Sequence, residues 1–284
     1  MSTSTPLQPT ARVAFERLID YAGLFPPAQL DMAAALAEYE TSRNGEHAWM
    51  LGRFIVPASR IGELLAHAGT SPIPLSVIVD SGSDARAWFG NSAHVLERLQ
   101  GYRENETRIS IEALEVPLPP LLSKRETYEA TIGQFAMLSE RYGLRELPTY
   151  VEIPRDERFG ELIVPTMAAF SRYGVGGKLR CGGVVAGAVP SPEEVATFLA
   201  ASGDASVPFK ATAGLHHPIR HFNEAAGFTM HGFLNLLAAA SQRNASEATL
   251  AEIIAREDAR DFNALDVEAL KRGREGRTSG GCAW

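Results

Sequence analysis

The chain of 284 residues has only two cysteines, Cys181 and Cys282, and no pair of cysteines spaced as CxxC. Two cysteines are too few for a disulfide framework, and free thiols are typical of a reducing compartment. No stretch approaches the roughly 18 consecutive apolar residues that a membrane span needs, and residues 1–20 lack the apolar core of a signal peptide. We therefore expect a cytoplasmic protein with no membrane partner.

Long basic runs are also missing, and the formal net charge is -7. This charge argues against nucleic acid as a partner. The sequence contains no GxSxG, no P-loop, no GxGxxG and no HExxH motif. Their absence disfavours α/β-hydrolases, P-loop NTPases, Rossmann dehydrogenases and metalloproteases of the HExxH class.

What the sequence does contain is a regular alternation of strand-like and helical segments, with no composition break that would mark a linker. Alternation of this kind is typical of a parallel sheet. The strand-like segments are LIDYAGLF, 53–59, 74–83, 108–118, 147–154, 176–183, 207–214 and the tail near GRTSGG. Eight such segments predict one (β/α)8 barrel domain over residues 1–284 that lacks its last helix.

Two ends of the predicted domain differ in composition from the rest. Residues 1–9 are rich in Ser, Thr and Pro and are expected to be loose, and residues 274–284 form a Gly-rich tail that ends with Cys282. The first and last strands have the weakest patterns. If they are not strands, six remain, and an open doubly wound sheet becomes the alternative fold.

The stretch from Gly176 to Pro218 holds two lysines in consecutive strand-like runs, GGKLRCGG and VPFKATAG. Side chains alternate along a strand, so Lys178 shares a face with Arg180, and Lys210 shares a face with Thr212. At the inner face of a barrel, among apolar neighbours and beside a second cation, a lysine is expected to have a lowered pKa and to form a Schiff base with a carbonyl substrate. The alternative is that both lysines form interior ion pairs that only stabilise the barrel.

This stretch resembles the class I aldolases of the deoxyribose-phosphate aldolase type, in the pattern K-x-x-x-G, a Pro-Glu-Glu helix start and F-K-x-x-x-G. The resemblance covers about 45 residues. It implies that Lys178 forms the Schiff base and that Lys210 assists it. Two stretches differ from the family: Leu179-Arg180-Cys181 stand where the family favours small hydroxyl residues, and Leu215-His216-His217-Pro218 replace a Gly-Ile-Arg ending.

Histidines are dense after the second lysine, with His216, His217, His221 and His231 within sixteen residues. Histidine suits both proton transfer and metal ligation. We predict His216 as a catalytic residue and His217 as a substrate contact. The alternative is a divalent metal held by His216, His217 and Glu152; otherwise no cofactor is expected.

Other candidates follow from their positions at predicted strand ends. Glu152 is the favoured proton carrier, because its strand directly precedes the strand of Lys178. Glu112 and Glu115 have opposite parity, so only one of them is expected to face inward. The predicted substrate-binding residues, which include Arg180 as a carboxylate or phosphate ligand, are Arg180, Asp20, Thr212, His217 and Asn235.

Three functional hypotheses result. The first is a barrel lyase of aldolase type, or an isomerase, that acts on a small carbonyl or carboxylate compound, with or without a phosphate group, through Lys178 and Lys210. The second is a metal-dependent barrel hydrolase or isomerase that uses the His216–His217 region. The third is a non-catalytic barrel that binds a small molecule, and it would be favoured if both lysines lie in interior ion pairs with no adjoining pocket. A homo-oligomer is expected in each case.

Overall fold

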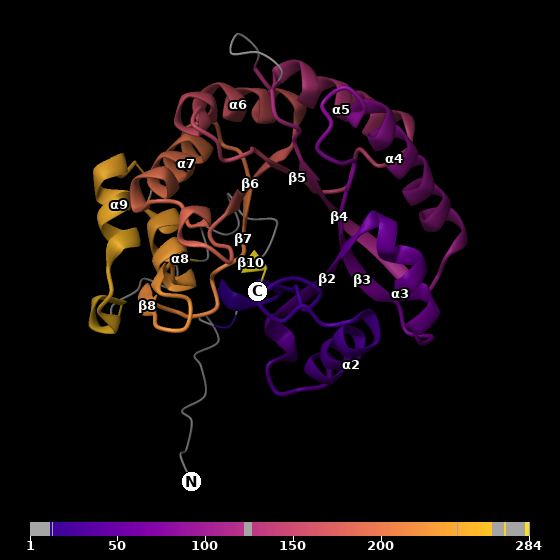
Figure 1. Cartoon of the computed structure of the whole chain (residues 1–284), viewed down its shortest axis with the longest axis horizontal. Coiled ribbons are helices and arrows are strands. Elements are labelled where there is room, and N and C mark those ends of the chain that lie inside the picture. The colour runs from indigo at the N-terminus through magenta and orange to yellow at the C-terminus, as the bar shows by residue number, and fades with distance from the viewer. Residues whose placement is uncertain are drawn as a thin grey trace.

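The computed structural model describes residues 12, 14–121, 127–242, 244–262, 270 and 282–283. In this part of the chain, parallel strands close into a barrel in the order β1-β10-β7-β6-β5-β4-β3-β2 (Figure 1). The strands are β1 (Ile19–Tyr21), β2 (Leu51–Pro57), β3 (Ile73–Ile78), β4 (Ile109–Pro117), β5 (Thr149–Glu152), β6 (Gly176–Arg180), β7 (Phe209–Thr212) and β10 (Cys282–Ala283). The predicted (β/α)8 barrel is confirmed, and the open doubly wound sheet is not formed.

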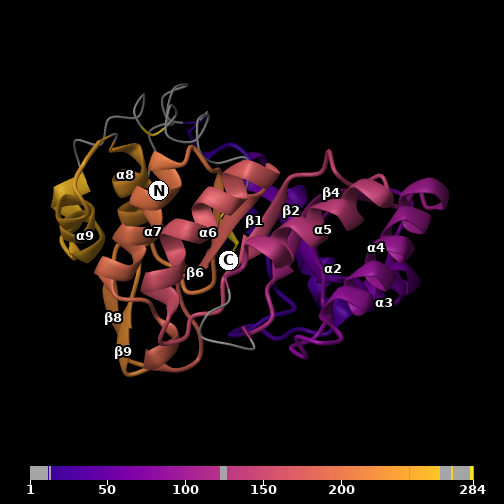
Figure 2. The ribbon, with the colours of Figure 1, turned by 90° about the horizontal axis from the view of Figure 1, so that it is seen from above.

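The helices surround the strands in chain order (Figure 1). They are α2 (Met32–Arg43), α3 (Ile61–His67), α4 (Trp88–Asn105), α5 (Glu129–Arg141), α6 (Phe159–Tyr173), α7 (Pro192–Asp204), α8 (Phe233–Ser241) and α9 (Glu247–Ala255). Viewed from above, α8 and α9 lie beside α7 at one end of the molecule (Figure 2). Within the described part of the chain, no helix is long and apolar enough to cross a membrane.

Local sequence signals explain where the helices begin and end. Before α7, the Ser191 hydroxyl accepts a hydrogen bond from the Glu194 amide, while the Glu194 carboxylate accepts one from the Ser191 amide. This capping box, with Pro192 in the first turn, satisfies amide groups that have no partner inside the helix. Helix α6 ends at Gly174, which adopts the left-handed conformation that glycine enters without a steric penalty.

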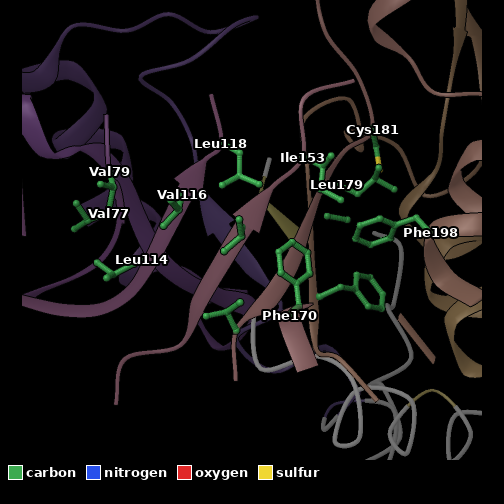
Figure 3. Close-up of a cluster of buried hydrophobic side chains, with 14 of the residues drawn as sticks. Val77, Val79, Leu114, Val116, Leu118, Ile153, Phe170, Leu179, Cys181 and Phe198 are labelled. Atoms are coloured by element: carbon green, nitrogen blue, oxygen red, sulfur yellow. The ribbon is translucent and has the colours of Figure 1, made fainter. Parts of the chain in front are cut away.

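The main hydrophobic core lies between the strands and the surrounding helices (Figure 3). Val77, Val116 and Leu179 point outward from β3, β4 and β6 and are fully or almost fully buried. Phe209 of β7 packs edge-on against Phe198 of α7, with ring centroids 6.1 Å apart. The apolar outer face predicted for Leu179 and Phe209 is therefore confirmed. The inner faces of the same strands are left for polar side chains.

The largest difference from the predicted elements lies in residues 222–242, which the sequence pattern predicts to be mostly helical. Strands β8 (His221–Asn223) and β9 (Phe228–Met230) instead form an antiparallel hairpin before α8. The Asn223 side chain accepts a hydrogen bond from the Ala226 amide, and Gly227 has a φ of 77°. A local turn of this kind competes successfully with a weak helical pattern.

Most residues at the two ends of the chain are not among those that the structure describes. The predicted loose residues 1–9 and the predicted tail residues 274–281 are not among the described residues. Of the predicted helix over 247–273, α9 accounts for Glu247–Ala255. Strand β10 pairs with β1 through Ile19↔Cys282 and with β7 through Thr212↔Ala283, and it closes the barrel.

Candidate active site

Lys210 lies on β7 with its side chain inside the barrel, where it has no exposed surface. Its ammonium group donates hydrogen bonds to Asp20 Oδ2 at 2.6 Å, Glu115 Oε1 at 2.7 Å and Ser76 Oγ at 3.1 Å. An ammonium group has three N–H donors, and these three acceptors use all of them. The Lys210 side chain is therefore fully paired inside the barrel.

Lys178 lies beside Lys210, because the two residues are register partners on β6 and β7. Its Nζ is 2.8 Å from Glu115 Oε2 and 2.8 Å from Glu152 Oε2. Lys178 is 6% exposed, whereas Lys210 is 0% exposed. Lys178 is thus the lysine nearer to solvent, and described residues account for two of its three N–H groups.

Glu115 joins the two lysines. Its Oε1 accepts hydrogen bonds from Lys210 and from Ser76 Oγ, the latter at 2.6 Å, and its Oε2 pairs with Lys178. Two cations directly opposite each other on neighbouring strands would repel one another. The carboxylate between them removes this repulsion and fixes both amines.

We name Asp20, Glu115, Glu152, Lys178 and Lys210 the lysine cluster. It holds three carboxylates and two ammonium groups inside the barrel. Burial raises the pKa of Glu115, but Lys178 and Lys210 lower it by more, so its net pKa lies far below the usual value. Glu115 therefore stays ionised.

The lowered lysine pKa expected from the sequence is not found for Lys178. Burial lowers its pKa, as the sequence argument assumed, but the Glu115 and Glu152 carboxylates raise it by more, and the net pKa lies above the usual value. A lowered pKa would require Lys210 to be an uncompensated neighbouring cation. In the folded protein, carboxylates compensate both charges.

At the outer end of the cluster, Arg180 follows Lys178 on the same face of β6. Its side chain is 57% exposed, and its Nε is 4.0 Å from Glu152 Oε1. Thr212 is its register partner on β7 and is buried. The geometry places Arg180 at the carboxyl ends of the strands, where it can contact a molecule that approaches Lys178.

At the inner end, Asp20 and Arg53 continue the cluster toward the amino ends of the strands. Asp20 has no exposed surface and accepts a hydrogen bond from the Arg53 amide at 2.7 Å. The Arg53 guanidinium is 3.8 Å from Asp20 Oδ2 and 3.3 Å from Glu112 Oε2. Asp20 thus positions Lys210, and its depth separates it from solvent.

Three predicted site residues follow β7 in the chain and do not lie on the strands of the lysine cluster. His216 and His217 lie in the loop after β7, and a large part of each residue is exposed. Partial burial of the His216 ring, together with His217, lowers the His216 pKa. Asn235 is fully buried, donates to the carbonyls of Ile253, Ile254 and Arg256 beyond α8, and accepts from the Arg220 amide. Because these structural contacts occupy its amide, Asn235 has no role in the proposed function.

His231, the fourth histidine of this group, is buried and neutral. Its Nε2 lies 2.7 Å from the Pro190 carbonyl, and its Nδ1 lies 3.2 Å from Arg220 Nη1. Burial lowers its pKa to about 4. Nε2 therefore carries the proton and donates to Pro190, and the ring joins the end of β9 to the segment before α7.

The metal alternative lacks a ligand set in the described residues, where no group of three or more His, Cys, Asp or Glu side chains is arranged to hold an ion. His216, His217 and Glu152 in particular do not form such a group. The carboxylates of the lysine cluster are bonded to ammonium groups instead.

Glu115 and Ser76 are central to the cluster but were not among the predicted site residues. Glu115 stands out in the sequence as an acidic residue inside the apolar run Ala113-Leu114-Glu115-Val116. Opposite parity alone leaves open which of Glu112 and Glu115 faces inward. Pairing between β3 and β4 shifts at Glu112, since Leu75 pairs with Ile111 and Ser76 with Ala113. A shift of this kind breaks simple alternation.

Comparisons with known proteins do not assign a family. No family model matches the sequence, and no curated protein matches it. Among solved structures, the chain is similar to a tetrameric deoxyribose phosphate aldolase from Aeropyrum pernix, with 13% sequence identity and a TM-score of 0.46. The similarity covers 73% of this chain and 80% of that one. Similarity at this level does not extend that protein's activity to this chain.

Proposed function

We propose that the protein is a barrel enzyme, a lyase of aldolase type or an isomerase, that acts on a small carbonyl compound through Lys178. The observation that supports this most is the position of Lys178, which lies beside Lys210 and between the Glu115 and Glu152 carboxylates at the outer end of the cluster. The arrangement agrees with the motif resemblance to class I aldolases, in which consecutive strands supply two lysines.

The two lysines have different roles in this proposal. Lys210 has all three donors occupied and no exposed surface, so it acts as a fixed charge that holds Glu115 and Asp20. Lys178 is buried but 6% exposed, and it lies beside Glu152, whose side chain is 16% exposed. A substrate that enters from the carboxyl ends of the strands reaches Lys178 and Glu152 first.

The raised pKa of Lys178 is compatible with Schiff-base formation because the overall charge at Nζ does not change. The ammonium gives one proton to Glu152, and the free amine attacks the carbonyl carbon to form a carbinolamine. Glu152 returns its proton to the carbinolamine hydroxyl, which leaves as water. One ammonium and one carbonyl thus become one iminium and one water, and Glu115 stabilises the positive charge before and after the step.

Glu152 Oε2 is 2.8 Å from Lys178 Nζ, so the proton can pass directly between the two groups. In the iminium, the same carboxylate lies close to Nζ and can remove a proton from a neighbouring carbon atom or accept one from a hydroxyl group. Removal of the proton from carbon is the step of an isomerase, and removal of the proton from the hydroxyl group is the step of an aldolase. Arg180 binds a carboxylate or phosphate on the substrate through its paired N–H groups.

Borohydride trapping tests the proposal directly. The protein is incubated with a panel of small aldehydes, ketones and keto acids, reduced, digested and analysed by mass spectrometry. The sequence has four lysines, Lys124, Lys178, Lys210 and Lys271, so the modified peptide is easily assigned. We expect an adduct on Lys178 with at least one compound, and loss of that adduct in Lys178→Met.

Proton exchange at the carbon beside the carbonyl gives a second readout, followed by NMR in D₂O. Glu152→Gln should slow both exchange and trapping while the protein stays folded. A folded wild-type protein that gives neither an adduct on Lys178 nor exchange across the panel would refute the proposal.

A non-catalytic barrel is the second candidate, because both lysines do lie in interior ion pairs. A non-catalytic barrel would bind a ligand but would give neither a borohydride-trapped adduct on Lys178 nor proton exchange beside the carbonyl. The same two measurements therefore separate the candidates.

A further inference from the structure

A cavity lies at the opposite end of the barrel from Lys178, beside the amino ends of β2, β3 and β4. Its volume is about 340 Å³. Its walls include Tyr39 and Arg43 of α2, Leu51 at the start of β2, and Pro72 and Pro74 around the start of β3. This volume falls in the lower part of the range found for small-molecule sites.

The charged side chains that line the cavity are two arginines and one glutamate, Arg17, Arg43 and Glu112. Ser110 adds a hydroxyl group to the same wall. The lining therefore has a net charge of +1 and favours an anion. Polar and apolar residues thus line the cavity together, and the charged groups among them suit an anionic ligand.

The arginines are held weakly enough to accept a ligand. Arg17 Nη2 is 2.7 Å from Glu112 Oε2, but the Arg17 side chain is 53% exposed, so water screens this ion pair. Arg43 is 3.7 Å from Glu40 and donates to the Pro72 carbonyl at 3.3 Å. An incoming carboxylate or phosphate can pair with both guanidinium groups, because each presents several N–H donors.

The backbone at Arg17 supports the same conclusion. Its φ is 48°, in the left-handed region that residues other than glycine seldom adopt. The Arg17 amide donates to the Trp49 carbonyl at 2.8 Å, which fixes this conformation just before β1. Strain of this kind is often found at binding sites. Arg17 is one of the residues that line the cavity.

We propose that this cavity binds a small organic anion that carries a carboxylate or phosphate group, held between Arg17 and Arg43. The site is separate from the mouth of the barrel, where Arg180 lies, and it does not depend on the function proposed for Lys178. Glu112 already pairs with Arg53 at 3.3 Å. It therefore keeps a cationic partner when the ligand takes Arg17.

Binding is measured on the full chain by isothermal titration calorimetry at low ionic strength, with inorganic phosphate, citrate and 3-phosphoglycerate as probes. We expect at least one probe to bind, and we expect Arg17→Gln and Arg43→Gln each to weaken it by about tenfold or more through loss of a charge-assisted contact. Comparison of citrate with the phosphates shows which anionic group is preferred. Circular dichroism confirms that each variant is folded.

Arg98→Gln, an exposed position on α4, is the control for net charge. It should bind the probe as the wild type does. Three results would overturn the proposal: no probe binds, binding is unchanged in both Arg17→Gln and Arg43→Gln, or Arg98→Gln weakens binding as much as they do. Failure to trap an adduct on Lys178 would not bear on this site.

Discussion

Glu115→Gln tests whether one carboxylate holds the lysine cluster together. The substitution keeps the shape of the side chain and removes its charge. Glu115 is 1% exposed and is shared by Lys178 and Lys210. Removing one partner of a buried ion pair typically costs about 3–5 kcal/mol, because the remaining charge is buried without compensation. We expect a loss of this size in the free energy of unfolding at pH 7.

The measurement is urea denaturation followed by circular dichroism, with the slope compared between variants. The double variant Glu115→Gln/Lys178→Met removes one ammonium together with the carboxylate. Its loss in unfolding free energy should therefore be smaller than the sum of the losses in the two single variants. Glu63→Gln is the matched control, since Glu63 pairs with Arg60 on the exposed surface. It should leave the unfolding curve unchanged.

The effect of pH has a defined sign. The pKa of Glu115 is lowered in the folded protein, so its contribution is fully present above the unfolded value of about 4.3 and is lost as the pH falls toward the folded value. The difference between wild type and Glu115→Gln should narrow progressively below about pH 4.5. A loss below about 1 kcal/mol at pH 7, or no double-variant rescue, would refute the account of Glu115 as the shared counter-ion.

Further predictions concern three residues outside the lysine cluster. The pKa of His231 is lowered to about 4 in the folded protein, so as the pH falls the unfolded chain binds a proton at a higher pH than the folded protein does. The free energy of unfolding should therefore fall by up to about 3 kcal/mol between about pH 6.5 and 4. Urea curves of His231→Gln should lack this part of the pH dependence, and a pH profile identical to that of the wild type would contradict the assignment. Asn235→Ala leaves buried carbonyl groups without donors and should lower the unfolding free energy by about 2–4 kcal/mol, whereas a change in ligand affinity at full stability would point to the substrate-binding role instead. Gly214 has a φ of 72°, and an added Cβ would lie 2.7 Å from Gly182 Cα, so Gly214→Ala should lower the melting temperature; Gly62→Ala on α3, where an added Cβ meets no atom within 4 Å, should not lower it.

The outer layer of the fold was predictable because its signals are local. Runs such as Pro74-Leu75-Ser76-Val77-Ile78 and the Ser191-Pro192 helix start show their structure in a few consecutive residues. The hairpin at Phe222 was missed, because its turn depends on one side-chain hydrogen bond and one glycine. A helical pattern over the whole segment hid that short signal.

The candidate site was predictable only in part. Alternation within β6 and β7 placed Lys178 and Lys210 on inner faces, and the order of strands placed Glu152 beside Lys178. The same alternation did not identify Glu115, because the register shift at Glu112 lies in the pairing between β3 and β4. Register shifts between strands have no fixed signature in the sequence of either strand.

The barrel class and the inner faces that carry the two lysines could be read from the sequence, because both follow from periodicity over a few residues. The pKa values of Glu115 and Lys178 could not, because they depend on ion pairs that form only in the folded protein. Asp20, Glu115 and Lys210 are separated by up to 190 positions in the chain and meet only when the barrel closes. A pKa depends on the distances to surrounding charges, and those distances exist only in the folded protein.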